Sequence, residues 1–304
     1  MLTDLTDTTT ADIRAALART RDQIGAPATG VVLNLIIKTD ESGQHDAVRA
    51  ASQAGREHPC RVLAVIARDA RATSRLDAEI RSGEGTPGQT VLLRLYGPMS
   101  DHADSVITPL LVPDTPVVTW WHGLLPAVPA AQPLGQLAQR RVTDAARAKA
   151  PAEALAALAA GYKPGDTDLS WTRATPWRSL LAATVDQEQD AIQGGSVSAE
   201  EDNPTADLLA AWLRSRLGVD FSRETSGGPG ITEVRMHTAA GDVVISRPDG
   251  RVATLTRPGQ PDRHVALQRR EIAELLAEEL RRLDPDEIYG ESLAAVAGIP
   301  ATTG

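Results

Sequence analysis

Two strongly apolar stretches occur in the first quarter of the chain. VVLNLII (Val31–Ile37) and RVLAVIA (Arg61–Ala67) are rich in β-branched residues, which is typical of strands covered on both faces. A polar turn at 40–43 follows the first stretch, and we interpret the next segment, 44–57, as a helix that ends at His58-Pro59. A strand, a helix and a second strand in this order predict a right-handed parallel βαβ unit.

Neighbouring patterns extend this unit into a sheet. Apolar residues at helical spacing predict an opening helix over 11–24. The segments 75–81 and 89–96 alternate apolar and polar residues, so an antiparallel hairpin is expected there. A short helix near 102–111 and the strand PVVTWW (Pro116–Trp121) complete a predicted sheet of about five strands.

The middle of the chain, from 124 to 165, is rich in proline and alanine, and helical stretches are expected at 134–149 and 152–160. Another helix is expected to begin at Thr175-Pro176, because proline is favoured in the first turn of a helix. The segment GGSVSAEEDNPT (Gly194–Thr205) contains small, polar and charged residues. We interpret it as a mobile linker.

The last third of the chain alternates between turn-forming sequences and short apolar patterns. Asn203-Pro204 precedes a helical pattern. Short strands at roughly ten-residue spacing are then expected at 231–238, 242–247, 251–257 and 263–267. A closing helix at 268–283 places its isoleucine and leucines on one face. This region is therefore predicted to be an antiparallel meander with that helix packed on one side.

Together these elements predict an α/β protein. Its N-terminal part is expected to be a mixed, mostly parallel sheet with flanking helices. Its C-terminal part is expected to be a smaller α+β antiparallel meander packed with helices. The predicted domains are a sheet domain at 1–165, a helical connector with the mobile linker at 166–203, and the C-terminal domain at 204–304.

Charge and cysteine content narrow the possible partners and compartments. The 304-residue chain has 31 basic and 40 acidic side chains and a net charge of −9. This charge repels polyanions, so neither nucleic acid nor a membrane is expected as a partner. The N-terminal sequence has no signal-peptide pattern and no long apolar run follows, so a cytoplasmic location is expected. Cys60 stands alone, which excludes an internal disulfide, and we expect it to be a buried core thiol.

Known catalytic and cofactor motifs are missing from the sequence. Gly83–Gly88 formally matches GxGxxG, but a dinucleotide-binding loop precedes a helix, whereas a strand is expected here, so we predict a hairpin turn. The sequence contains no P-loop, no GxSxG and no HExxH motif, and its six histidines are not at metal-ligand spacing. We therefore expect no catalytic residues, no bound cofactor and no metal.

Aromatic residues are scarce, and four of the five tryptophans fall in two short segments. These segments are TWWHG (Thr119–Gly123) and DLSWTRATPWR (Asp168–Arg178). Tryptophan and arginine are favoured in interface hot spots, although tryptophans here would also suit a core that joins helices to the sheet. His122 follows a predicted strand, at the edge where open α/β sheets place their sites. The candidate partner-binding residues are Trp120, Trp121, His122, Trp171, Arg173, Trp177 and Arg178.

Three segments carry a resemblance to a known family. HPCRVLAV (His58–Val65), TWWHGLLP (Thr119–Pro126) and especially DLSWTRATPWR resemble the glucose-6-phosphate dehydrogenase assembly proteins, the OpcA family. Their order and spacing and the chain length also fit. The resemblance implies a non-catalytic partner that promotes assembly or allosteric activation of glucose-6-phosphate dehydrogenase in the oxidative pentose phosphate pathway. Thiol control, known for some members, is not expected here because Cys60 has no second cysteine to pair with.

Two alternatives stay open. One is an enzyme or sensor that binds a sugar phosphate or nucleotide at the carboxyl edge of the sheet. It would use His122, Arg173 and Arg178 as anion ligands. The other is a structural scaffold with a different partner.

Overall fold

The computed structural model describes residues 1–24, 31–83 and 86–296. The chain forms two compact units, each with its own sheet. Unit 1 comprises Met1–Asp144, Gly165–Thr167 and Ile272–Pro285. Unit 2 comprises Ala145–Pro164, Asp168–Glu271 and the residues from Asp286 onward.

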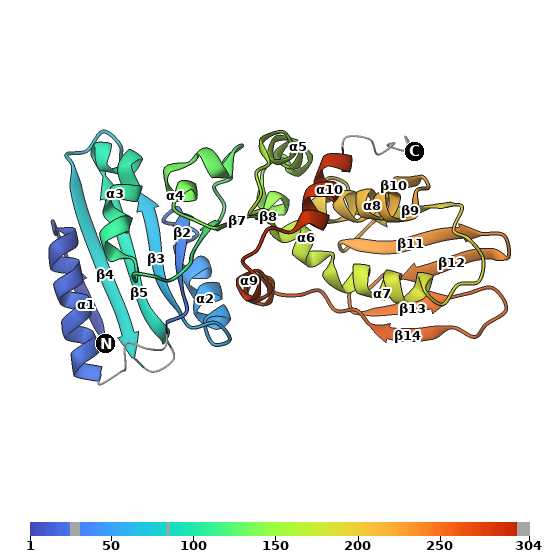
Figure 1. Ribbon diagram of the computed structural model, residues 1–304, viewed down its shortest axis with the longest axis horizontal. Helices are drawn as coiled ribbons and strands as arrows, with labels where there is room; N and C mark the ends of the chain where they lie inside the picture. Colours follow the sequence, from blue (N-terminus) through green and yellow to red (C-terminus); the bar gives the residue numbers. More distant parts are fainter. Residues whose placement is uncertain (25–30, 84–85, 297–304) are drawn as a thin grey trace. The chain divides into compact units, whose positions relative to one another are not determined.

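Unit 1 is built on an eight-stranded, mostly parallel sheet in the order β1-β4-β5-β3-β2-β6-β7-β8 (Figure 1). Neighbouring strands among β5, β3, β2, β6 and β7 run parallel, which confirms the predicted βαβ unit. β4 pairs antiparallel with β5 and with β1, so the predicted hairpin is confirmed. Its turn residues 84–85 lie outside the described residues. The strands are β1 (Leu2–Leu5), β2 (Leu33–Thr39), β3 (Cys60–Ala67), β4 (Arg75–Gly83), β5 (Thr86–Tyr96), β6 (Val117–Trp121), β7 (Arg140–Thr143) and β8 (Asp166–Asp168).

Helices cover both faces of this sheet because its central strands are apolar on both sides. The chain passes from β2 to β3 in one direction and from β5 to β6 in the other, so right-handed crossovers place α2 and α3 on opposite faces. α1 (Thr10–Ile24) and α3 (Ala103–Ile107) share one hydrophobic core with the strands. α2 (Gln44–Ala54) buries four alanines and a valine, and α9 (Ile272–Arg281) packs against it (Figure 1).

The central part of the sequence folds differently from the prediction. A helix was expected over 134–149, but only Pro133–Gln136 is helical (α4) before the chain enters β7. All four residues of β7 are buried in the sheet beside β6. The alanine-rich composition favours a helix locally, but pairing with a buried strand overrides this preference. The short strands β1, β7 and β8 also raise the sheet from the expected five strands to eight.

The closing helix packs elsewhere than predicted. Residues 268–283 were expected to pack on the antiparallel meander, but α9 belongs to unit 1. Its apolar stripe includes the buried residues Leu275, Leu276 and Leu280. Such a stripe shows that a helix has one buried face but does not identify its neighbour. A buried ion pair between Arg140 and Glu279 connects α9 to β7.

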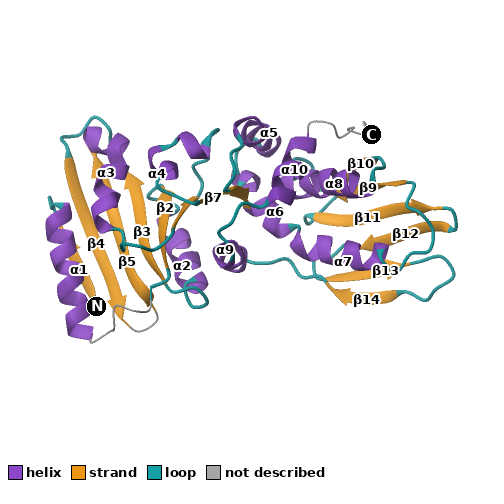
Figure 2. Ribbon diagram, in the orientation of Figure 1, coloured by secondary structure: helices purple, strands orange, loops and turns teal. Residues whose placement is uncertain are grey.

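Unit 2 contains a six-stranded sheet in the order β10-β9-β11-β12-β13-β14 (Figure 2). Its pairs are antiparallel except β9–β10, and the four strands of the predicted meander are confirmed. The strands are β9 (Gly194–Ala199), β10 (Phe221–Thr225), β11 (Ile231–Thr238), β12 (Gly241–Ser246), β13 (Val252–Thr256) and β14 (Arg263–Ala266).

Helices α7 (Thr175–Val185) and α8 (Pro204–Leu217) pack on this sheet and share its hydrophobic core. α8 begins where the sequence predicts, because the Asn203 side chain accepts a hydrogen bond from the Ala206 amide at 3.1 Å. It ends at Gly218, whose φ of 69° suits glycine. The remaining helices of the described part of unit 2 are α5 (Pro151–Gly161), α6 (Leu169–Arg173) and α10 (Glu287–Ala295).

The segment interpreted as a mobile linker contains β9, an interior strand of the sheet in unit 2. Residues 194–199 pair with β10 on one side and β11 on the other. The small residues that suggested flexibility have a packing reason. A Cβ added to Gly195 would lie 2.1 Å from the Arg235 carbonyl oxygen on β11 and 2.6 Å from Cε1 of Phe221. Glycine at this position therefore lets the Phe221 ring pack against the strand.

Candidate functional site

The carboxyl end of β6 holds the first group of predicted site residues. Trp120 is fully buried and its ring meets that of His122 edge-on, with ring centroids 5.0 Å apart. His122 is itself buried, and its Nδ1 lies 3.5 Å from Oγ1 of Thr39 at the end of the neighbouring strand β2. His122 therefore lies at the carboxyl edge of the sheet, where the sequence places it, but within the protein interior.

The loop after β2 closes tightly over His122. Asp40 accepts hydrogen bonds from the Gly43 amide at 2.7 Å and the Ser42 hydroxyl at 2.8 Å, which together hold the pKa of its carboxyl below the ordinary value. A Cβ added to Gly43 would lie 2.9 Å from Thr39 Oγ1 and 3.0 Å from His122 Nδ1. Only glycine fits this position without a shift of its neighbours.

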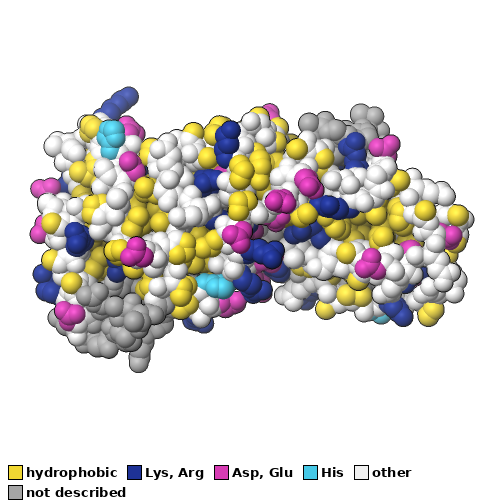
Figure 3. Space-filling view, in the orientation of Figure 1, with side chains coloured by type: hydrophobic (Ala, Val, Ile, Leu, Met, Phe, Trp, Pro, Cys, Tyr) yellow, Lys and Arg dark blue, Asp and Glu magenta, His cyan; other side chains and the backbone are white. Residues whose placement is uncertain are grey.

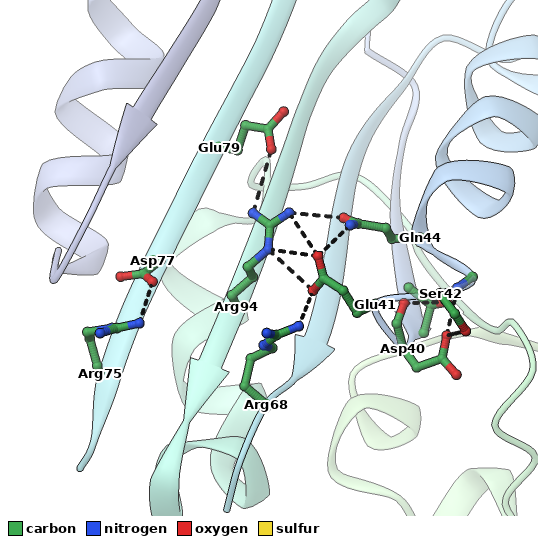
Figure 4. Close-up of polar contacts among 11 residues, drawn as sticks. Asp40, Glu41, Ser42, Gln44, Arg68, Arg75, Asp77, Glu79 and Arg94 are labelled. Carbon is green, nitrogen blue, oxygen red and sulfur yellow. Dashed lines mark hydrogen bonds and ion pairs between the residues drawn. The ribbon is translucent and has the colours of Figure 1, made fainter. Parts of the chain in front are cut away.

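A network of charged side chains surrounds the same edge (Figure 4). Glu41, in the loop after β2, accepts from Arg68 at 2.6 Å and from Arg94 on β5 at 3.4 Å. Arg94 also donates to Gln44 and lies 3.6 Å from Glu79. The side chains of Arg68 and Glu41 are 36% and 43% exposed, so this solvent-accessible pair adds little to stability. The network instead fixes the loop in place beside the ends of β3 and β5.

On the other face of β6, Trp121 lines a cavity of about 270 Å³ together with Lys38, Asp101 and the first residues of α4. Burial lowers the pKa of Lys38, and the nearby Asp101 carboxylate opposes this effect. The sequence analysis did not select Lys38 or Asp101, because a single lysine and a distant aspartate share no motif. Only the folded sheet brings them to one cavity.

The DLSWTRATPWR segment lies in unit 2 and forms α6 and the start of α7. The Trp171 ring is buried, and its Nε1 donates to the Asp286 carboxylate at 2.8 Å. The guanidinium of Arg178 stacks over this ring, 3.6 Å from its centroid, and the Tyr289 ring lies 5.9 Å away. This cluster joins α6 and α7 to α10 inside unit 2.

Trp177 is also buried, in the core beneath α7. The guanidinium of Arg247 lies 4.9 Å from the centre of its ring. Arg173 is half-buried, and both it and Trp177 line a cavity of about 260 Å³ in unit 2. His122 thus belongs to unit 1, whereas Arg173 and Arg178 belong to unit 2.

Burial changes how the predicted contact residues can act. Trp120, Trp121, Trp171 and Trp177 are each at most 4% exposed, so their rings pack inside the fold. Arg173 and Arg178 keep part of their surface accessible. The fifth tryptophan, Trp212, was not among the candidates, yet it is half-buried on α8. The sequence did not indicate Trp212 as a contact residue, because it was only one of the apolar positions in a predicted helix.

Within the described residues, no group of three or more His, Cys, Asp or Glu side chains is arranged to hold a metal ion. Cys60 is buried as predicted, and burial raises the pKa of its thiol to about 12. No helix among the described segments is long and apolar enough to cross a membrane.

Comparison with known proteins identifies the family. Residues 51–160 match the model of the glucose-6-phosphate dehydrogenase subunit N-terminal domain, and residues 164–293 match that of its C-terminal domain. No match was found among curated proteins. An NAD binding oxidoreductase from Klebsiella pneumoniae aligns with a TM-score of 0.40 and 10% identity, over 88% of this chain and 95% of its own. With the two adjoining domain models matched in order, the chain belongs to the OpcA family of glucose-6-phosphate dehydrogenase assembly proteins.

Proposed function

We propose that this protein is a non-catalytic partner of glucose-6-phosphate dehydrogenase that binds the enzyme and promotes its active assembly. The observation that carries the proposal is the match of two family models, both named for subunit domains of that dehydrogenase, between residues 51 and 293. A protein of this kind changes activity only if it binds the active and inactive states of the enzyme with different affinities.

The surface proposed for this contact is the groove between α7 and α8. Leu181 and Val185 from α7, and Trp212 and Leu217 from α8, line an apolar hollow of about 240 Å³. Hydrophobic side chains are visible over this part of unit 2 in the space-filling view (Figure 3). A half-buried tryptophan in an apolar groove is the kind of residue that dominates protein–protein binding energy.

The buried tryptophans support this surface from within. Trp177 packs against the sheet from α7, and Trp171 connects α6 to α10 through Asp286. In this proposal Arg178, which stacks on Trp171 and precedes Leu181 by three residues on α7, contributes a polar contact to the partner. The conspicuous tryptophans therefore position the contact residues instead of meeting the partner themselves.

The test is a titration of purified dehydrogenase with this protein, following enzyme activity and oligomeric state together. We expect co-purification of the two proteins, and a rise in activity that saturates with added partner. If the dehydrogenase neither binds nor changes activity or assembly at saturating concentrations of this protein, the proposal is wrong.

The groove is tested separately with Trp212→Ala. Loss of a central tryptophan is expected to weaken dehydrogenase binding by about thirtyfold, as for an interface hot spot. Val252→Ala is the matched control, because Val252 is an apolar side chain on β13 that is 47% exposed. Circular dichroism checks that both variants are folded. If both then bind the dehydrogenase with equal affinity, the groove is not the contact surface, although the partnership itself is not contradicted.

A further inference from the structure

The cavity beside Trp177 in unit 2 concentrates positive charge in a protein whose net charge is negative. It has a volume of about 260 Å³, and its lining includes five arginines but only two acidic residues, Glu200 and Asp202. Oε1 of Glu200 is engaged by the Gly230 amide at 2.8 Å. The arginines are Arg147, Arg173, Arg247, Arg269 and Arg270.

Arg247 is the most informative of these side chains because it is buried, with 5% of its surface exposed. Its Nη1 and Nη2 donate to the backbone carbonyls of Leu267 and Ile231 at 2.8 and 2.9 Å. Among the described residues no carboxylate forms an ion pair with Arg247, and its Nε has no hydrogen-bond partner. A buried cation without a counter-charge is costly, and a bound anion would remove much of that cost.

The surroundings of Arg247 add to the positive potential. Burial, followed by the positive charge of Arg269, lowers the pKa of its guanidinium to about 10, and the Asp249 carboxylate opposes this shift only in part. The cavity also includes Asn203, Pro204 and Thr205, at the start of the 14-residue helix α8. The N-terminus of a helix carries a partial positive charge and is a common site for phosphate binding.

We propose that this cavity is a binding site for a phosphate group, either free or carried by a small metabolite. Arginine suits such a ligand because its planar guanidinium makes paired hydrogen bonds to phosphate oxygens. The volume suits a phosphate with a small attached group, since it is below the range of about 300–1,000 Å³ that holds larger ligands. The site lies wholly within unit 2 and does not depend on the proposed dehydrogenase partnership.

The experiment is isothermal titration calorimetry of the full-length protein, without dehydrogenase, in chloride buffer. The probes are inorganic phosphate, glucose 6-phosphate and glucose. We expect phosphate and glucose 6-phosphate to bind with one site per chain, and glucose not to bind. Tighter binding of glucose 6-phosphate than of phosphate would indicate a metabolite as the source, and the reverse would indicate free phosphate.

Substitutions of the arginines that line the cavity test whether phosphate binds there. Arg269→Gln alters an exposed side chain on the cavity wall and is expected to weaken phosphate binding about tenfold. Arg263→Gln is the matched control, because Arg263 is an exposed arginine on β14 outside the cavity lining. Arg247→Met is expected to abolish binding. Because that variant alters a buried residue, Arg147→Gln, at an exposed position, provides a second measurement.

Several results would overturn the proposal. One is the absence of heat from inorganic phosphate and glucose 6-phosphate at millimolar concentration. Another is equal affinity of the Arg269→Gln and Arg263→Gln variants. A third is binding of a poly-glutamate peptide by the same arginines without any binding of phosphate, which would make the cavity a peptide site. None of these measurements involves the dehydrogenase. A negative result would therefore overturn the phosphate site without contradicting the proposed function.

Discussion

The guanidinium of Arg140 on β7 is bound by the carboxylate of Glu279 on α9, a residue 139 positions later in the chain. Nε and Nη2 of Arg140 lie 3.0 and 2.5 Å from Oε2 of Glu279. Both side chains are buried, and Nη1 of Arg140 also donates to the Asp284 carbonyl at 2.8 Å. This ion pair attaches the closing helix to the sheet of unit 1.

Removing one partner of this pair is expected to be costly. Glu279→Ala leaves the buried charge of Arg140 without its carboxylate and is expected to lower the free energy of unfolding by about 3–5 kcal/mol. Urea denaturation measures the loss, and hydrogen exchange should show that α9 loses protection before the central strands. The double variant Arg140→Met, Glu279→Leu restores an uncharged, packed pair and is expected to regain most of the stability. A double variant as unstable as Glu279→Ala would contradict this account.

A second prediction concerns the hydrogen bond from Trp171 to Asp286. Trp171→Phe keeps a buried ring but removes the Nε1 donor, so we expect a loss of about 1.5–3 kcal/mol in the unfolding free energy. The Asp286 carboxylate also caps α10 by accepting from the Tyr289 amide at 3.0 Å. Faster hydrogen exchange is therefore expected in α10. Trp212→Phe makes the same chemical change at a half-buried position and serves as the control; equal losses in both variants would argue against a special role for Trp171.

A third prediction follows from the lack of space around Gly43. Gly43→Ala places a methyl group against Thr39 Oγ1 and His122 Nδ1, so we expect destabilisation by about 1–3 kcal/mol and a shifted NMR signal for the His122 ring. Gly227→Ala is the matched control because an added Cβ there has no neighbour within 4 Å. Unchanged His122 signals in Gly43→Ala would show that the loop moves without disturbing this histidine.

A fourth prediction concerns Cys60. Burial raises the pKa of the thiol from 9.0 to about 12, so the neutral form is favoured in the folded state. Its contribution to stability is therefore fully present below pH 9 and is lost as the pH rises towards 12. Cys60→Ala should remove this part of the alkaline loss, as measured by urea denaturation across that range.

The same thiol should resist alkylation by iodoacetamide at pH 8 in the folded protein and react readily in urea. Mass spectrometry counts the modified chains. Rapid modification of the native protein at pH 8 would show that Cys60 is accessible, contrary to its position inside β3.

Local patterns in the sequence were sufficient for much of the fold. The apolar runs at 31–37 and 61–67 predict buried strands, the alternating pattern within 75–96 predicts a hairpin, and the structure confirms both. The meander strands were also found, because turn-forming residues separate them at regular spacing. Burial of Cys60 followed from its residue type and its position beside an apolar strand.

Other features depend on partners that are distant in the chain. Residues 140–143 form a strand because their backbone pairs with β6, although the alanine-rich flanking residues favour a helix. Gly194–Ala199 has the composition of a linker, but it lies between two strands and against Phe221. In both cases non-local hydrogen bonds outweigh local preference.

The sequence by itself determined the fold class, the parallel strand–helix–strand core and the family. These features depend on residues that are close together in the sequence. The apolar stretches indicate the buried strands, and the DLSWTRATPWR segment indicates the family. Only the tertiary structure decided that four tryptophans are buried, that α9 packs in unit 1, and that five arginines line one cavity. Whether a side chain lies inside or at a surface depends on which distant segments cover it, and that coverage is set by packing across the whole chain.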